Sequence, residues 1–229
     1  MASRVALGLD KLGLALKSQA WAGAGARGLT PTQGQILALL RARGERALRL
    51  TQVAEELAIS APTASDSVRA LVEKGLIRKA RAKDDARAVA LELTAEGKNE
   101  AAWAATWPHF LLAAVEALTE EEQEIFLLAL IKIIHALGER GQIPMQRMCV
   151  TCRYFQPNAH PERHPPYRCA LVDAPLGPRH LRLDCPDFAA GEPGSSRERL
   201  AILRPPPAFR EVEEEVPASA AVGGNQAGR

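Results

Sequence analysis

The chain has 229 residues and 47% of them are hydrophobic, enough for one ordinary domain and a smaller module. Lys and Arg total 29 against 27 Asp and Glu, a balance that excludes a histone-like polycation but not a local basic patch. No apolar run reaches the roughly 18 residues of a membrane span. Because Asp10, Lys11 and Lys17 interrupt the apolar N-terminus, we predict a helix there rather than a signal peptide, and a cytoplasmic protein with reduced thiols.

The prolines and cysteines divide the chain into three parts. Four of the 16 prolines precede residue 149, whereas all four cysteines follow residue 148. Residues 1–143 therefore predict a helical domain, and residues 144–190 predict a small, loop-rich module that carries the cysteines. Residues 191–229 have too little apolar content to fold alone, so we expect a mostly disordered tail.

The helical domain begins with a helix over about residues 1–21, followed by three more with marked starts. Thr30 begins a Thr-Pro-Thr-Gln sequence, which offers an N-cap, a proline in the first turn and a capping-box glutamine. Thr51 can cap the next helix. Ser60 can cap the one after it, which Gly75 ends.

A hairpin and two longer helices complete the domain. Apolar and polar residues alternate over 89–93, which predicts a strand, and the turn at 83–85 pairs it with 77–81. Thr94 begins a helix to about Leu118 that Pro108 interrupts, and Thr119 begins a last helix to about Arg140. The predicted fold class is therefore mainly α with a small β-hairpin wing (α+β), a winged helix-turn-helix with extra helices at both ends.

Residues 60–69 have the pattern of a DNA recognition helix. Val68, Leu71 and Val72 face the core at helical spacing. Hydroxyl and guanidinium groups on the other face can bind phosphates or base edges. The predicted DNA-binding residues here are Ser60, Thr63, Ser65, Asp66, Ser67 and Arg69.

The hairpin is the second predicted DNA contact. Its basic residues are Arg78, Lys79, Arg81, Lys83 and Arg87, against Asp84 and Asp85. A basic wing suits the minor groove or the backbone, and its binding should weaken steeply with salt. The plainer alternative is a solvated charged turn.

These segments resemble the MarR family of bacterial transcriptional regulators. The resemblance covers about residues 29–98, in LTPTQGQILALL and LTQVAEELAISAPTASDSVRALVEKGLIRKARAKDDARAVALELTAEGK. Its signature stretches are Gly75-Leu76-Ile77-Arg78, Asp85-x-Arg87 and Leu93-Thr94-x-x-Gly97. The resemblance implies that Asp85 pairs with an arginine to support the wing and that Arg87 reaches the minor groove.

The resemblance also implies a homodimer that binds double-stranded DNA at a pseudo-palindromic operator. The apolar residues of the two terminal helices suit such an interface, with an intramolecular core as the alternative; they are Leu7, Leu9, Leu12, Leu14, Leu16, Ile125, Phe126, Leu128, Ile131, Ile133, Ile134 and Leu137. Related regulators bind small aromatic ligands between the dimer helices and the DNA-binding lobe. Trp103 and Trp107, four residues apart, are more simply packing residues, but a ligand-pocket role stays open.

The cysteines follow the pattern Cys149-x2-Cys152-x16-Cys169-x15-Cys185, which has no counterpart in the MarR pattern. Two disulfides are disfavoured in the cytoplasm, and unconnected buried thiols would not be expected to gather in a polar, proline-rich segment. Four thiolates on a metal or cluster would explain how a segment of roughly 45 residues with little core can fold.

The spacing favours an iron–sulfur cluster, [4Fe–4S] ahead of [2Fe–2S], over Zn²⁺. Zinc usually takes its sulfurs from two CxxC knuckles, whereas this chain has one, and Cys185-Pro186 resembles the end of ferredoxin motifs. The cysteine spacing is also similar to that of high-potential iron–sulfur proteins. Tyr154, Phe155, Tyr167 and Phe188 lie close to the cysteines in sequence and suit either a cluster's apolar shell or the core of a zinc module.

Five histidines complete the candidates. His160, His164 and His180 stand among the cysteines, where four thiolates already suffice as ligands, so we expect surface or supporting roles. His109 and His135 lie in predicted helices and are interpreted as packing residues.

The predicted function is a sequence-specific transcriptional regulator, in particular a repressor, with redox- or metal-dependent DNA affinity. The sequence has no nucleophile–base arrangement, P-loop or dinucleotide fingerprint, so we predict no enzyme. Two alternatives stay open. One is induction by a small phenolic ligand with a purely structural zinc module. The other is an electron-transfer protein that uses the winged domain for docking.

Overall fold

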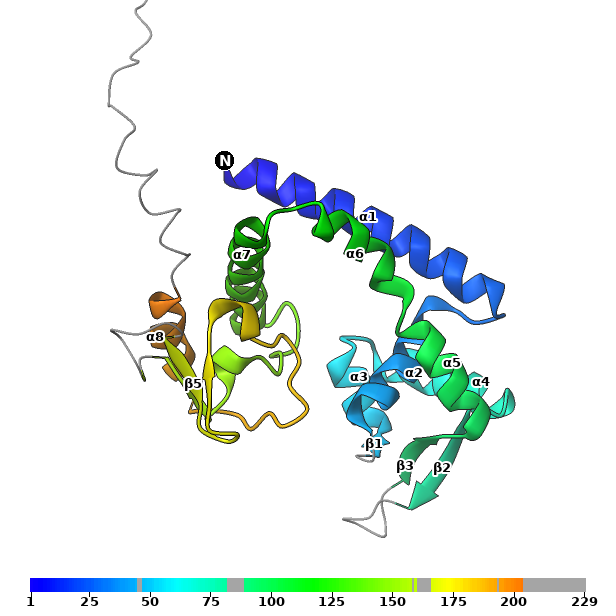
Figure 1. The fold of residues 1–229 in the computed structure, drawn as a ribbon. Coiled ribbons are helices and arrows are strands. Elements are labelled where there is room, and N and C mark those ends of the chain that lie inside the picture. The colour runs from blue at the N-terminus through cyan, green and yellow to red at the C-terminus, as the bar shows by residue number, and fades with distance from the viewer. Residues whose placement is uncertain (45–46, 82–88, 158, 160–165, 193, 204–229) are drawn as a thin grey trace, which may run out of the picture. The chain divides into compact units, whose positions relative to one another are not determined.

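The computed structural model describes residues 1–44, 47–81, 89–157, 159, 166–192 and 194–203 (Figure 1). They fall into two compact units. The winged-helix unit comprises Met1–Leu118, Ile134–Arg147 and Asp184–Phe188, and the second unit comprises Thr119–Ile133, Met148–Leu183 and the chain from Ala189 onward.

The first 118 residues form a helical array with one small sheet. The helices are α1 (Ala2–Ala26), α2 (Pro31–Arg43), α3 (Leu50–Glu56), α4 (Ala61–Glu73), α5 (Ala95–Ala104), the 3₁₀ turn η1 (Trp107–His109) and α6 (Phe110–Glu116). The strands are β1 (Leu48–Arg49), β2 (Ile77–Arg81) and β3 (Val89–Leu93). The interruption that was predicted at Pro108 is confirmed, because η1 separates α5 from α6.

The predicted hairpin is confirmed, and a third strand joins it. β2 and β3 pair antiparallel, with Ile77 opposite Leu93 and Arg81 opposite Val89. β1 pairs with the other edge of β3, so the sheet order is β1-β3-β2. A strand of two residues has no measurable alternation, so the sequence pattern missed it.

Side-chain caps begin the helices where the sequence predicts them, with one correction. Thr30 and Gln33 form a reciprocal capping box, and Thr119 forms another with Glu122 at α7 (Glu120–Glu139). Ser60 and Thr94 each accept a bond from the backbone N–H three residues on. The predicted cap at Thr51 is wrong, because α3 already begins at Leu50.

The core of the winged-helix unit lies where α2, α4 and the sheet meet. Ile36, Leu37 and Leu71 are fully buried, and Ile77 and Leu91 bring the two long strands to them. Burial of each such side chain contributes about 1.5–3 kcal/mol to folding. The recognition segment is therefore held by one face only, which leaves its other face to solvent.

The second unit contains short elements and its own apolar core. The short elements are the N-terminal part of α7, η2 (Cys149–Thr151), β4 (Phe155–Gln156), β5 (Tyr167–Cys169), β6 (Ala174–Leu176), η3 (Pro178–His180) and α8 (Ser195–Ile202). β5 lies between β4 and β6 in an antiparallel sheet that the sequence did not predict. The Phe155 and Tyr167 rings lie 5.5 Å apart, and Met148, Val150 and Leu181 are buried.

Helix α8 lies in the segment that was expected to be a disordered tail. Arg199 from α8 donates to the carbonyl oxygen of Cys152, and Leu203 is buried. The tail from residue 204 lies outside the described residues. None of the described helices is long and apolar enough to cross a membrane.

Candidate nucleic-acid interface and cysteine segment

Helix α4 presents the predicted recognition face to solvent. Ala64, Val68 and Leu71 are buried on one side. Of the predicted DNA-binding residues, Ser60, Thr63, Ser65, Asp66 and Arg69 are exposed and Ser67 is half-buried. The side chains of Asp66 and Arg69 are 69% and 70% exposed and form an ion pair at 2.8 Å. Such a pair is weak in water, so Arg69 can exchange its partner for a phosphate or a guanine.

Two of the predicted contacts also have a structural role. Ser60 Oγ accepts a bond from the Thr63 backbone N–H at 3.2 Å and lies 2.8 Å from Thr63 Oγ1. These hydroxyls therefore begin the helix, and they stay exposed enough to contact a phosphate as well. Since Ser65 and Arg69 are not part of the cap, they are the stronger candidates for base readout.

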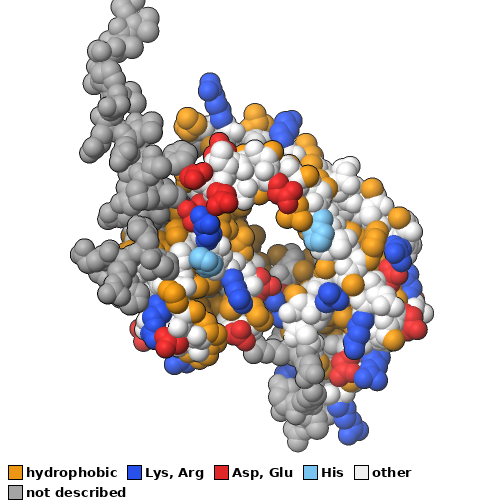
Figure 2. Space-filling view, in the orientation of Figure 1, with side chains coloured by type: hydrophobic (Ala, Val, Ile, Leu, Met, Phe, Trp, Pro, Cys, Tyr) orange, Lys and Arg blue, Asp and Glu red, His pale blue; other side chains and the backbone are white. Residues whose placement is uncertain are grey.

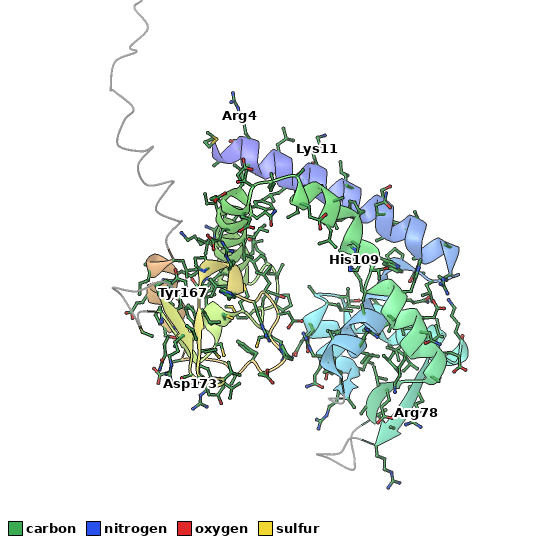
Figure 3. All side chains as sticks on the ribbon, in the orientation of Figure 1. Arg4, Lys11, Arg78, His109, Tyr167 and Asp173 are labelled. Carbon is green, nitrogen blue, oxygen red and sulfur yellow. The ribbon has the colours of Figure 1, made fainter. Side chains whose placement is uncertain are left out.

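The start of the hairpin adds positive charge beside the recognition helix. Arg78, Lys79 and Arg81 are all exposed, and Arg78 pairs with Glu92 on the neighbouring strand at 2.8 Å (Figure 3). Figure 2 shows several basic side chains around this end of the winged-helix unit. Lys83, Asp85 and Arg87 lie outside the described residues, so their predicted wing roles stay predictions.

The turn between α3 and α4 sets the position of the recognition helix. The N–H of Ile59 bonds to the carbonyl of Ala54 and that of Ala58 to the carbonyl of Glu55, which is a Schellman end. This geometry puts Ala58 in the left-handed region, at φ 53°. Glycine is the usual residue there, so the turn keeps its shape at an energetic cost.

The predicted dimer surface is largely exposed on α1, whereas on α7 its residues are buried or half-buried. Leu7, Leu12 and Leu14 are 40–58% exposed on α1, from which Arg4 and Lys11 also project (Figure 3). By contrast, Leu128 and Ile131 of α7 are buried within the second unit. The intramolecular alternative therefore holds for these two α7 residues, whereas the α1 face leaves apolar area for a partner.

The two tryptophans do not share one helix as predicted, but they do touch. Trp103 lies in the last turn of α5 and Trp107 begins η1, and the rings meet edge to face at 5.4 Å. Trp107 packs on Gly34 and lines an apolar groove of about 610 Å³ between α1, α2 and η1. Trp103 does not line it, so only Trp107 keeps the predicted ligand-pocket role. The Trp107 Nε1 is buried and has no hydrogen-bond partner among the described residues.

None of the four cysteines is in a disulfide. Local hydrogen bonds position the cysteines of the second unit. Cys149 and Cys152 flank η2, where the Cys152 N–H donates to the Cys149 carbonyl at 2.9 Å. The backbone N–H of Arg182 donates to Cys149 Sγ at 3.2 Å. Cys169 lies on β5 opposite Phe155.

Cys185 belongs to the winged-helix unit and is held by Arg147. The Cys185 N–H donates to the Arg147 carbonyl at 3.0 Å, and the Arg147 guanidinium donates back to the Cys185 carbonyl at 2.9 Å. Within the described residues, the structure gathers no set of three or more His, Cys, Asp or Glu side chains that could hold a metal ion. A four-cysteine centre therefore stays a prediction.

The histidines take varied positions. His180 Nδ1 accepts a bond from the Gly177 N–H at 3.0 Å, and His109, the last residue of η1, is exposed (Figure 3). His135 is 2% exposed, and its Nε2 has no hydrogen-bond partner in the described part of the chain. His160 and His164 lie outside the described residues.

Sequence reasoning missed one charged cluster. Arg43 at the end of α2 binds Glu56 of α3 and Asp184, the residue before Cys185. These partners lie far apart in sequence and carry no motif, so no local signal could have found them.

The comparisons with known proteins agree on a winged helix. A model of the MarR family matches residues 27–88. Staphylococcus aureus MepR, in a structure described as a MepR–DNA complex, is 26% identical with a TM-score of 0.51, and the match covers 58% of this chain and 97% of that one.

Two further solved structures are similar. MepR in a DNA-binding conformation is 25% identical with a TM-score of 0.52, over 58% of this chain and 98% of that one. YusO from Bacillus subtilis is 23% identical with a TM-score of 0.41, over 62% and 94%. The comparison with curated proteins gave no match.

The family match and the two MepR structures assign a winged-helix fold to this part of the chain. MepR is described as a transcription regulator of a multidrug efflux pump, and like the MarR family it is not an enzyme, as was predicted for this chain. All four cysteines lie outside the residues that the family model matches. The comparisons therefore show that residues 27–88 are similar to the MarR family and that this part of the chain shares the winged-helix fold of MepR.

Proposed function

We propose that the protein is a dimeric, sequence-specific transcriptional repressor that inserts α4 into the major groove of an operator. The observation that carries the proposal is the polar, exposed face of α4 beside the basic start of the hairpin. The family match and the MepR–DNA complex support the same role. A helix held by one apolar face can enter the groove without losing its core contacts.

The dimer is proposed from the apolar face of α1. A second copy that covered Leu7, Leu12 and Leu14 would remove this exposed area from water. Twofold symmetry then places two copies of α4 on half-sites about one helical turn apart, which requires a pseudo-palindromic operator.

The test uses a DNA probe that is selected from a pool of random duplexes by its binding to the protein. We expect a palindromic consensus and a binding constant that falls steeply with salt. Arg69→Ala should relax specificity at one base position by about 1–3 kcal/mol, whereas Lys11→Gln on α1 should leave binding unchanged. Absence of any selected sequence, together with a reversible redox centre, would favour the electron-transfer alternative.

We further propose that the four cysteines bind one iron–sulfur cluster or zinc ion whose state sets operator affinity. Four thiolates in one short segment are soft ligands of the kind that Fe–S clusters and Zn²⁺ select. The N–H that points at Cys149 Sγ and the aromatic pair Phe155–Tyr167 beside the CxxC turn support a thiolate centre with an apolar surround. The sequence spacing favours the cluster.

Anaerobic purification followed by iron, sulfide and zinc analysis separates the two metals. A brown protein with equal iron and labile sulfide supports the cluster, and a colourless protein with one zinc per chain supports the ion. Cys152→Ser and Cys169→Ser should both lose the metal and change operator affinity. Metal loss with unchanged affinity would contradict the regulatory part of the proposal.

The groove beside Trp107 favours a second candidate, induction by a small phenolic ligand. The buried Nε1 of Trp107 can donate to an oxygen of a ring that enters between α1 and α2. Titration with benzoate and phenol should then quench tryptophan fluorescence and weaken operator binding. Trp107→Phe keeps an aromatic ring but lacks the N–H donor, so it should bind benzoate and phenol more weakly. Unchanged affinity for these ligands would contradict induction through this groove.

A further inference from the structure

One lysine at the end of the recognition helix contacts the end of α1 and the start of α2. Lys74 is the C-cap of α4, and its Nζ donates to the carbonyl oxygen of Gly28 at 2.5 Å and to Gln33 Oε1 at 2.9 Å. These partners lie 46 and 41 residues away in the chain, so the contact is not a local cap. We call Lys74, Gly28 and Gln33 the lysine anchor.

The α2 side of the lysine anchor is a buried acceptor. Gln33 is 7% exposed, and its Oε1 also accepts the Thr30 backbone N–H at 3.2 Å as half of the capping box. Because both neighbours are donors, the oxygen of the side-chain amide must face them. The Lys74 ammonium therefore binds an oxygen whose position is fixed by the first turn of α2.

The α1 side of the lysine anchor is fixed by backbone hydrogen bonds. The N–H of Leu29 donates to the carbonyl of Ala24 at 2.9 Å. The N–H of Gly28 donates to the carbonyl of Gly25 at 3.1 Å, which completes a Schellman end. Gly28 lies in the left-handed region at φ 63°, where glycine has no Cβ penalty. Since Ala24 and Leu29 are also buried, the Gly28 carbonyl oxygen is rigidly connected to the end of α1.

The lysine anchor holds the end of α4 that is remote from the predicted base contact at Ser65. α4 has 13 residues and is therefore about 20 Å long. A pivot of about 10° at Lys74 would move the start of α4 by about 3 Å, which is close to one base-pair step. The apolar contacts of Val68 and Leu71 keep α4 on the core, but such contacts are non-directional and fix a tilt less sharply than hydrogen bonds do.

We propose that the lysine anchor fixes the tilt of α4 relative to α1 and so sets the half-site spacing that the dimer accepts. α1 carries the proposed dimer surface, so two copies of α1 form the frame on which both recognition helices are placed. Lys74 is then a positioning residue and not a DNA contact. The inference rests on the proposed dimeric DNA binding and adds to it the residue that determines operator spacing.

Operators with altered spacing test the lysine anchor. The duplex selected by the full-length protein is compared with two derivatives that gain or lose one central base pair, which displaces the half-sites by about 3.4 Å and about 34°. Lys74→Met keeps the aliphatic chain but lacks the ammonium donor, and it disturbs little of the core because Lys74 is exposed. Lys98→Met is the matched control, since Lys98 is an exposed lysine on α5 in the same unit and is not part of the anchor.

For wild type and Lys98→Met, we expect both derivatives to bind on the order of tenfold more weakly than the selected duplex. In Lys74→Met this ratio should fall to within about threefold, because a less restrained α4 can follow the displaced half-site. A merely structural role of Lys74 would lower the free energy of unfolding without changing the ratio.

A wild-type ratio in Lys74→Met overturns the proposal, as does an equal relaxation in Lys98→Met. Wild-type protein that binds all three duplexes equally overturns it too. If Lys74→Met does not fold, as judged by far-ultraviolet circular dichroism, Lys74→Gln decides by the same criterion, since glutamine is shorter and uncharged.

Hydrogen exchange separates this proposal from the proposed function. The Leu29 amide reports on the end of α1, and the Leu76 amide, which bonds to the Leu71 carbonyl at 2.9 Å, reports on the end of α4. If no duplex is selected, or if the protein is a monomer, the proposed function fails. The fixed tilt then stands only if both amides exchange faster in Lys74→Met than in Lys98→Met, and equal exchange overturns it.

Discussion

Gly97 lies so close to Leu76 that a Cβ at residue 97 would be 1.9 Å from the Leu76 carbonyl oxygen. That carbonyl also accepts the Thr94 N–H at 3.1 Å, and the Thr94 hydroxyl donates to the carbonyl of Gly75. The Leu93-Thr94-x-x-Gly97 stretch is therefore the joint where α5 packs against the start of the hairpin. A glycine is required there by contact with backbone, which cannot move aside like a side chain.

Gly97→Ala should destabilise the winged-helix unit by about 3 kcal/mol, since the added methyl group overlaps backbone and α5 must shift. Urea unfolding followed by tryptophan fluorescence measures the loss. Gly13→Ala is the control, because nothing lies within 4 Å of a Cβ there and alanine favours a helix. Equal stability of the two variants would contradict this account.

Ala58→Gly should stabilise the protein by about 1 kcal/mol, because glycine adopts the left-handed conformation of the α3–α4 turn without a Cβ clash. The same change at Ala70 within α4 should instead cost about 1 kcal/mol, since that position is helical. Parallel urea titrations of the two variants check the opposite signs. A loss of stability in Ala58→Gly would show that the turn does not have this conformation.

Lys79→Gln should weaken operator binding to a similar extent on all sequences. It should also make the fall of log K with log salt shallower, reducing the magnitude of the slope by about 1. The reason is that an exposed lysine at the start of the wing is expected to neutralise one phosphate. Lys11→Gln removes the same charge from α1 and should leave the slope unchanged. A changed consensus in Lys79→Gln, with an unchanged slope, would mean that Lys79 reads a base instead.

Chelation should unfold the second unit while the winged-helix unit stays folded. Loss of the proposed metal would leave a small core around Phe155 and Tyr167 to hold that unit alone. The aromatics provide separate reporters, because both tyrosines (Tyr154 and Tyr167) lie in the second unit and all three tryptophans (Trp21, Trp103 and Trp107) lie in the winged-helix unit. We expect the tyrosine near-ultraviolet signal to collapse and the tryptophan emission to persist. An unaltered tyrosine signal would contradict a structural role for the metal.

The amino-acid sequence by itself determined the elements whose signals are local. Thr30, Ser60 and Thr94 each cap a helix by accepting a bond from the backbone N–H three residues on, and Pro108 interrupts a helix because it would stand in the helix interior. The alternation over 89–93 likewise suffices for a strand, although its burial does not alternate, since Val89 is exposed and Ala90 and Leu91 are both buried. These rules depend on neighbours within one turn, so they hold without knowledge of the rest of the chain.

Only the tertiary structure decided which surfaces are covered and which distant residues meet. The sequence could not show that Leu128 is buried while Leu7 is exposed, because both lie in equally apolar helices and burial depends on what packs against each. Nor could it bring Asp184 to Arg43, 141 positions apart, since an ion pair of that range leaves no periodicity or spacing to read. Long-range contacts follow from how the chain closes on itself, and here that closure brings Asp184 to the end of α2.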